Sequence, residues 1–250
     1  MPLQPPLTRS FNDVAPARPT NAILAALPQG EYDRLSPHLQ PVDLPQGKML
    51  YDVDEPVRTV YFHESGMTSL VVTSDEGTDV EVGVIGWEGV VGGGSGLTST
   101  LSPCATMIQL AGKGYAMPVE VMNLEFKRGG LFQELMLRHI QMLSVMMGQC
   151  GLCNRLHSVE ERLSRWLLMA SDQTGLERLE LTQEFIANML GTRRSGVTVA
   201  AGLLRAAGLI DYARGSIVII DRAGLESSAC ECYGVVNKHL MGLKRAEHSA

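Results

Sequence analysis

The side chains best suited to chemistry lie between Leu181 and Ile210, and the chemistry that they suit is hydrogen bonding to DNA. Arg193 and Arg194 open a predicted helix, and the first turn of a recognition helix reaches base edges in the major groove. A guanidinium donates two hydrogen bonds to guanine O6 and N7, a pairing worth about 1–3 kcal/mol of discrimination, so Arg194 is expected to read a guanine. The predicted DNA-contacting residues are Thr182, Gln183, Arg193, Arg194, Ser195, Thr198 and Val199.

The other members of this set differ in their expected contacts. Ser195 suits a base edge or a phosphate, and Val199 suits a thymine methyl group. Gly202, further along the same face, removes bulk where the helix would approach DNA. Phosphate contacts set the register of a protein on DNA without reading its sequence, and they are expected from Thr182, Gln183, Arg193 and Thr198.

Two helices joined by a turn at Gly191–Thr192 must position these side chains. Thr182 and Thr192 are the expected N-caps, and the second helix is expected to end at Gly208. One face of that helix is apolar and is expected to pack on the first helix; its residues are Val197, Ala200, Ala201 and Leu204. The alternative is a helical hairpin with a solvated arginine pair.

A hairpin is predicted directly after this unit, from Ile210–Ala213 and Ser216–Ile220 around Arg214-Gly215. Such a hairpin suits the wing of a winged helix-turn-helix. Asp221 is then expected to cap a final helix over about Ala223–Lys244.

The first half of the chain has a different pattern. Short apolar runs alternate with Gly, Asp and Pro from Pro41 to Met117, which is typical of an antiparallel barrel or sandwich. Ser74–Gly77 is a predicted hairpin turn, and a glycine-rich excursion, Gly86–Thr100, interrupts the strands. Short helices are expected at Asn21–Leu27, Glu31–Leu39 and Val119–Phe126.

A long helix is predicted over Leu131–Leu156, and it carries two apolar stripes. The first stripe holds Leu131, Leu135, Met142, Met146 and Cys153, and the second holds Met136, Ile140, Leu143 and Met147. Two apolar faces need two partners. The β-domain suits one face, and the same helix of a second subunit suits the other, with Gly148 and Gly151 allowing close approach. The alternative is a helix buried within one monomer. A capping box at Ser158 and Glu161 then opens a helix over Val159–Ala170.

Composition limits the class of protein. A chain of 250 residues with a formal charge of -6 is not a general polyanion-coating protein. From Arg178 to Asp221, however, five arginines face four acidic residues, so this segment is slightly positive. Five cysteines without a secretion signal favour reduced thiols and a cytoplasmic location. No apolar run reaches transmembrane length.

The order of β-domain, long helix, helix-turn-helix and wing resembles the Crp/Fnr family of bacterial transcription regulators over residues 21–222. The motifs that carry the resemblance are Cys153–Leu163 and Leu181–Gly208. The resemblance implies a cyclic-nucleotide-binding-like β-roll, a homodimer along the long helix and a two-fold symmetric DNA site. Arg194 stands where the family places a guanine-reading arginine, whereas Val199 stands where the best-known member has another base-contacting arginine. RNA polymerase is a further candidate partner.

We therefore expect an α+β fold with an N-terminal antiparallel, jelly-roll-like β-roll, a long dimerisation helix and a C-terminal winged helix-turn-helix. The expected segments are a flexible arm (1–20), a β-roll sensor (21–128), the dimerisation helix (129–156), the DNA-binding domain (157–222) and a C-terminal helix (223–250). The predicted function is a sequence-specific, homodimeric DNA-binding transcription regulator that is not an enzyme.

A cyclic nucleotide is not the expected effector. The phosphate cassette of this fold resembles Gly-Glu and, further on, Arg-Ser/Thr-Ala, but here Gly93 stands at the glutamate position and Pro103 at the arginine position. Burying a phosphate without a cation is costly. The backbone N–H groups of Gly92, Gly93 and Gly94 could still form an anion-binding nest for an effector. The alternative for this stretch is a flexible loop between strands.

Other chemistry receives less support. Cys150 and Cys153 lie one helical turn apart, and Cys230 and Cys232 lie on the predicted final helix, where they would point apart. Zinc needs more ligands than either pair supplies, so packing thiols are expected and no metal, cofactor or catalytic residue is assigned. The alternative function is a small-molecule-binding β-roll or cupin-like protein whose C-terminal module mediates protein contacts.

Overall fold

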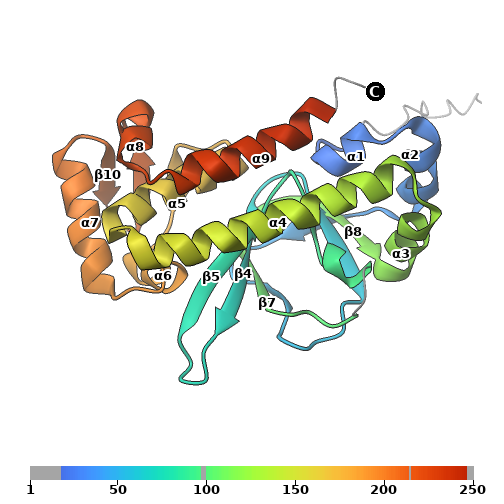
Figure 1. Ribbon diagram of the computed structural model, residues 1–250, viewed down its shortest axis with the longest axis horizontal. Coiled ribbons are helices and arrows are strands. Elements are labelled where there is room, and N and C mark those ends of the chain that lie inside the picture. Colours follow the sequence, from blue (N-terminus) through green and yellow to red (C-terminus); the bar gives the residue numbers. More distant parts are fainter. Residues whose placement is uncertain (1–17, 97–99, 214, 247–250) are drawn as a thin grey trace, which may run out of the picture.

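The computed structural model describes residues 18–96, 100–213 and 215–246. The predicted arm therefore lies outside the described residues except for 18–20, and Arg214 at the predicted wing tip lies outside them as well. A long helix, α4 (Gly130–Leu156), crosses the middle of the molecule, with the N-terminal β-strands on one side and residues 159–228 at one end (Figure 1). No helix in the described ranges is long and apolar enough to cross a membrane.

The N-terminal strands form two antiparallel four-stranded sheets, as their alternating sequence predicted. One sheet has the order β1-β8-β3-β6 and the other β2-β7-β4-β5. Val60, Phe62, Ile85 and Met117 are buried between them. The predicted turn at 74–77 joins β4 to β5. The strands are β1 (Gln40–Leu44), β2 (Met49–Tyr51), β3 (Thr59–His63), β4 (Met67–Thr73), β5 (Asp79–Ile85), β6 (Val90–Val91), β7 (Ala105–Leu110) and β8 (Gly112–Pro118).

Short helices close the end of this β-roll. They are α1 (Ala22–Ala26), α2 (Gln29–Leu35), η1 (Ser36–His38), η2 (Gly93–Gly96) and α3 (Val119–Arg128). The predicted helix at 31–39 is in fact α2 followed by the separate turn η1, because Pro37 interrupts it. Arg34 of α2 and the buried Glu125 of α3 form an ion pair that joins the two helices.

The long helix α4 matches its predicted range within one residue, and both of its predicted stripes carry buried residues. Met136 is fully buried, and Leu143 and Met147 line a cavity of the β-roll. The side of α4 that faces away from the β-roll instead carries Leu137 and Leu152, which are 47% and 39% exposed. The sequence left open which stripe faces the β-roll, because spacing does not show where the β-roll curves around the helix.

The C-terminal domain contains one strand more than predicted. Helix α5 (Val159–Thr174) begins with the predicted capping box of Ser158 and Glu161. The wing strands β10 (Ile210–Ala213) and β11 (Ser216–Ile219) pair with β9 (Arg178–Glu180) in the order β10-β11-β9. Between β9 and β10 lie α6 (Gln183–Met189) and α7 (Arg194–Ala206).

The single final helix of the prediction is wrong. Asp221 caps α8 (Arg222–Ser228) as expected, but the chain becomes extended at Ala229, and α9 (Cys232–Ala246) starts anew. Helix α9 runs back along α4 towards α1 (Figure 1). Helix α9 therefore covers one side of the long helix.

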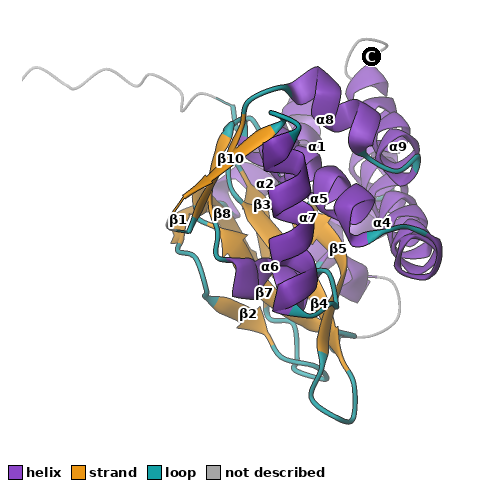
Figure 2. Cartoon of the chain, turned by 90° about the vertical axis from the view of Figure 1, so that its left-hand side faces the viewer, coloured by secondary structure: helices purple, strands orange, loops and turns teal. Residues whose placement is uncertain are grey.

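The two domains share an apolar core. Met67 and Val84 of the β-roll and Met142 and Met146 of α4 belong to the same buried cluster as Trp166 of α5. Helix α6 contacts β5 and helix α5 contacts β4, at the end of the β-roll that faces the viewer in Figure 2. The position of the C-terminal helices is thus tied by packing to the β-roll.

Candidate nucleic-acid interface

The turn between α6 and α7 orients the two helices. Gly191 has a positive φ of 55°, which glycine adopts without steric cost. The N–H of Thr192 donates to the carbonyl of Ala187 at 2.9 Å and closes the turn. The predicted N-cap at Thr192 is wrong: α7 is preceded by Arg193, whose side chain makes no cap hydrogen bond. Thr182 does cap α6 and accepts from the N–H of Phe185.

One face of α7 is buried as predicted. Val197, Ala200, Ala201 and Leu204 are each no more than 3% exposed. They share a core with Ile186, Met189 and Leu190 of the α6 segment. Small alanines allow α7 to pack closely on α5 and α6, and this packing holds the helix in one orientation.

The opposite face of α7 is exposed, also as predicted. Val199 is 64% exposed, which is unusual for a large apolar side chain on a helix that is well packed on its other side. The exposed residues of this face are Arg194, Ser195, Thr198, Val199 and Gly202. Their contacts with DNA stay a prediction.

Polar contacts connect the predicted phosphate-binding residues. The Thr198 hydroxyl donates to Gln183 Oε1 at 2.7 Å, so these side chains from α7 and α6 lie together. Arg194 Nε lies 3.9 Å from Glu184 Oε2, with both side chains about two-thirds exposed. At such exposure the pair contributes little free energy, so Arg194 can leave Glu184 for another partner.

Sequence reasoning missed Arg162 of α5. Its Nη2 donates to Asn154 Oδ1 at 2.6 Å and also to the backbone carbonyl of Leu190. Arg162 therefore links the end of α4 to the helix-turn-helix turn. The arginine is buried, and nothing in a single sequence distinguishes it from the exposed arginines nearby.

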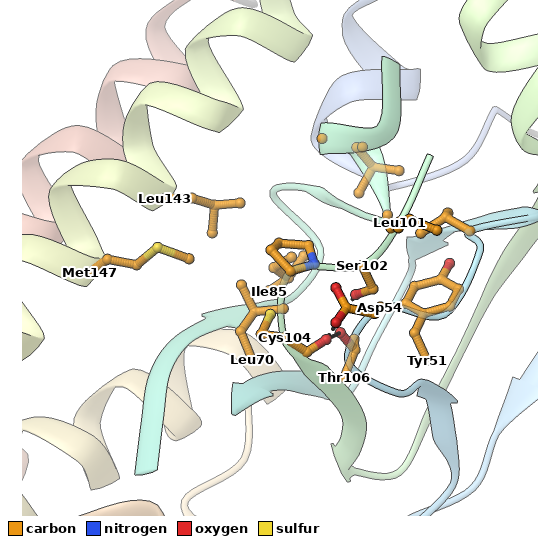
Figure 3. A pocket seen from close by; sticks show the side chains of 16 residues that line it. Tyr51, Asp54, Leu70, Ile85, Leu101, Ser102, Cys104, Thr106, Leu143 and Met147 are labelled. Carbon is orange, nitrogen blue, oxygen red and sulfur yellow. Dashed lines mark hydrogen bonds between the residues drawn. The ribbon is translucent and has the colours of Figure 1, made fainter. Parts of the chain in front are cut away.

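The β-roll contains a cavity of about 450 Å³ next to α4. Gly92, Gly93 and Gly94, the predicted effector-binding residues, line it, and Leu143 and Met147 reach towards it from α4 (Figure 3). Most of the other lining side chains are apolar. Among the described lining residues there is no arginine or lysine, and Asp54 is the one carboxylate.

The predicted arrangement of the cysteines is also wrong. Cys230 and Cys232 do not point apart on one helix, because the break before α9 turns both thiols towards Cys153. His157, at the end of α4, joins this group. Two features of the sequence could have indicated this cluster. One is the spacing of one helical turn between Cys153 and His157, and the other is the Cys-Glu-Cys segment at 230–232.

Known proteins resemble this chain in one domain by sequence and over most of its length by fold. Residues 161–228 match the family model described as a Crp-like helix-turn-helix domain. A structure from Eubacterium rectale, described as a transcriptional regulator of the Crp/Fnr family, is 18% identical, with a TM-score of 0.64 over 81% of this chain and 94% of that chain. FixK2 from Bradyrhizobium japonicum is 15% identical, with a TM-score of 0.65 over 77% of this chain and 98% of that one.

A third similar structure is CLP from Xanthomonas campestris, a c-di-GMP responsive global regulator, at 16% identity and a TM-score of 0.62 over 77% of this chain and 99% of that one. No curated protein matches the chain by sequence. The chain thus carries a Crp-like helix-turn-helix domain within the fold of the Crp/Fnr regulators. The predicted fold class and resemblance are confirmed.

Proposed function

We propose that the protein is a cytoplasmic, homodimeric transcription regulator of Crp/Fnr type that reads a two-fold symmetric DNA site and catalyses no reaction. The observation that carries this proposal is the recognition helix α7. One face of α7 is packed into a three-helix core, and the other presents Arg194, Ser195 and Val199 to solvent. A rigid helix with exposed first-turn side chains suits insertion into a major groove.

The proposed contacts with DNA fall into two groups, those to bases and those to phosphates. Arg194 reads a guanine, Val199 meets a thymine methyl, and Ser195 contacts a base or a phosphate. The bonded pair of Gln183 and Thr198 lies at the junction of α6 and α7 and suits one phosphate. Thr182 and Arg193, both exposed, suit phosphates beside it.

The proposed dimer forms through the outer face of α4, which we define as Leu137, Ile140, Ser144, Gly148, Gly151 and Leu152. These residues are exposed, apart from the half-exposed Ile140. Besides three apolar side chains the face carries one serine and two glycines, and a Cβ added at Gly148 or Gly151 would meet no atom within 4 Å. The same helix of a second copy fits such a face by two-fold symmetry and would double the recognition helices.

The proposed regulator does not depend on cyclic AMP. The described lining of the β-roll cavity offers no cation for a cyclic phosphate, and Gly93 and Pro103 occupy the positions at which the resemblance expects a glutamate and an arginine. A relative of the same fold is c-di-GMP responsive, so the fold does not specify cyclic AMP. The apolar lining suits a largely uncharged effector.

DNA fragments selected from the genome by the wild-type protein test this proposal in a gel-shift assay. Saturable binding that weakens with salt is expected. Replacing Arg194 by alanine should lower affinity for the selected site about tenfold or more and relax selectivity at one guanine per half-site. Arg205→Ala is the matched control, because Arg205 is equally exposed at the other end of α7 and pairs with Asp211. Cyclic AMP should leave the affinity unchanged.

The experiment can contradict the proposal in two ways. Binding without sequence preference at moderate salt would favour a β-roll protein whose C-terminal module mediates protein contacts. If Arg194→Ala selects the same DNA site as the wild type, Arg194 does not read a guanine.

A further inference from the structure

Four side chains of the kind that bind metal ions meet where α4 ends and α9 begins. Cys153 lies in the last turn of α4, and His157 is the residue that follows the helix. Cys230 lies in the turn between α8 and α9, and Cys232 is the first residue of α9. One ligand atom from each residue lies within 4.8 Å of those of the other three.

The spacing of these atoms suits one tetrahedral ion. The Sγ atoms of Cys153 and Cys230 are 3.5 Å apart, and Cys232 Sγ lies 3.7 Å from His157 Nδ1. Zinc–sulfur bonds of about 2.3 Å and zinc–nitrogen bonds of about 2.0–2.1 Å, in tetrahedral geometry, separate the ligand atoms by about 3.5–3.8 Å. Atoms this close enclose a single ion and leave no room for an iron–sulfur cluster.

Burial of the ligands suits a structural site. Cys153 and Cys232 are 0% exposed and Cys230 is 4% exposed. The three thiols form a cluster of their own, separate from the two large apolar cores. Structural zinc sites are closed in this way, with four protein ligands and no open position for a substrate.

Glu231 supplies the orienting contact that zinc-bound histidines usually have. Its Oε2 lies 3.1 Å from His157 Nε2. With Nε2 directed to the carboxylate, Nδ1 is the nitrogen that faces Cys232, so the ring is oriented for metal binding through Nδ1. The segment Cys230-Glu231-Cys232 therefore provides two ligands and the group that aligns a third.

Two buried arginines near the thiols complement the negative charge of such a site. Three thiolates, a neutral imidazole and Zn²⁺ carry a net charge of -1. Arg162 and Arg165 of α5 are 7% and 5% exposed and are electrostatically coupled to Cys153 and Cys230. A buried guanidinium is costly without an opposite charge, and an anionic zinc–thiolate centre provides one.

We propose that Cys153, His157, Cys230 and Cys232 bind one Zn²⁺ ion that fastens the end of α4 to the turn between α8 and α9. His157 directly precedes the DNA-binding helices and Cys230 directly follows them. The ion thus fixes both ends of the α5–α8 segment at one point. It restrains rotation of the recognition helix about the junction between α4 and α5. The site departs from the sequence-based expectation of packing thiols.

Metal analysis of the purified full-length protein tests this site. After expression in zinc-supplemented medium, we expect about one zinc per wild-type chain and about a tenth of that or less in Cys230→Ser and Cys232→Ser. Cys150→Ser is the matched control, because Cys150 is also buried in α4 one turn before Cys153 but is not a ligand. It should keep about one zinc per chain.

A second measurement covers the case in which the ligand variants do not fold. Replacing zinc by Co²⁺ in the wild-type protein should produce the visible absorption of tetrahedral cobalt with thiolate ligands. A chelator should lower the Tm of the wild type because the ion binds only the native state. Substoichiometric zinc in the wild type, iron in its place, a Cys153–Cys230 disulfide, or equal zinc in Cys230→Ser would each overturn the proposal. These readouts do not depend on DNA binding, so they are separate from the test of the proposed function.

Discussion

At the scale of single residues, Glu81 shows how the β-roll is joined to the DNA-binding domain. Its carboxylate lies in β5 and accepts hydrogen bonds from Ser69 Oγ at 2.6 Å and from Trp166 Nε1 of α5 at 2.9 Å. Burial raises the pKa of Glu81 to about 7, although both hydrogen bonds act to lower it. Near neutral pH this domain contact therefore depends on a carboxyl group that is partly protonated.

The raised pKa of Glu81 predicts a loss of stability with increasing pH. Between about pH 4.5 and pH 7 the native state binds more protons than the unfolded chain, so the free energy of unfolding falls as the pH rises through this window. The loss is at most about 3 kcal/mol. Glu81→Gln can keep both hydrogen bonds without a charge, so it should be more stable than the wild type at pH 8 and gain little at pH 5.

Urea unfolding at the two pH values measures this effect. Glu76→Gln, at the exposed tip of the β4–β5 hairpin, should follow the wild-type profile. Some pH dependence should persist in Glu81→Gln, because burial also raises the pKa of Glu88 to about 7. A stability change of the same size at pH 5 and pH 8 would contradict the assigned ionisation.

At the scale of elements, Gly202 of α7 is a position at which stability and DNA affinity are expected to respond in opposite directions to one substitution. The residue lies inside the helix, is exposed, and an added Cβ would meet no atom within 4 Å. Alanine there should raise the free energy of unfolding by about 0.5–1 kcal/mol through helix propensity. In the proposed complex with DNA the same methyl group would lie between α7 and the floor of the groove, so the affinity for the selected DNA site should fall.

Chemical denaturation and gel shift of Gly202→Ala test these opposite effects. Gly234→Ala is the matched control, because Gly234 is likewise exposed within a helix with open space at its Cβ, but on α9. That variant should be stabilised without loss of DNA affinity. Unchanged affinity in Gly202→Ala would mean that this part of α7 does not approach DNA.

The elements also show where sequence reasoning succeeds. Helix α4, the capping box of α5 and the two faces of α7 depend on spacing and local caps, and each was predicted. The break between α8 and α9 falls at Ala229, where no glycine or proline indicates it in the sequence. Strand β9 is a strand only because it pairs with β11. Local patterns do not reveal such distant partners.

At the scale of the whole molecule, the proposed two-fold symmetric DNA site requires two recognition helices. Each chain supplies one, so a second copy of the chain is needed. Leu152→Glu should shift the proposed dimer towards monomer, because two carboxylates would be brought close across the two-fold axis in an apolar contact. Sedimentation velocity measures the change, and DNA affinity should fall with it. Leu124→Glu is the control, since Leu124 is 63% exposed and belongs to α3 rather than to the outer face of α4. A dimer that survives Leu152→Glu and Leu137→Glu would exclude this interface.

The sequence alone determined the order of the domains, the long helix and the exposed face of α7, because each depends on residues that are close together in the chain. Only the tertiary structure decided that Leu143 and Met147 of α4 line the cavity and that a third face, with Leu137 and Leu152, lies outside. It also brought Cys153 and His157 next to Cys230 and Cys232. A metal site is defined by distances between ligand atoms, and the fold sets those distances when it returns the chain from α8 to the end of α4.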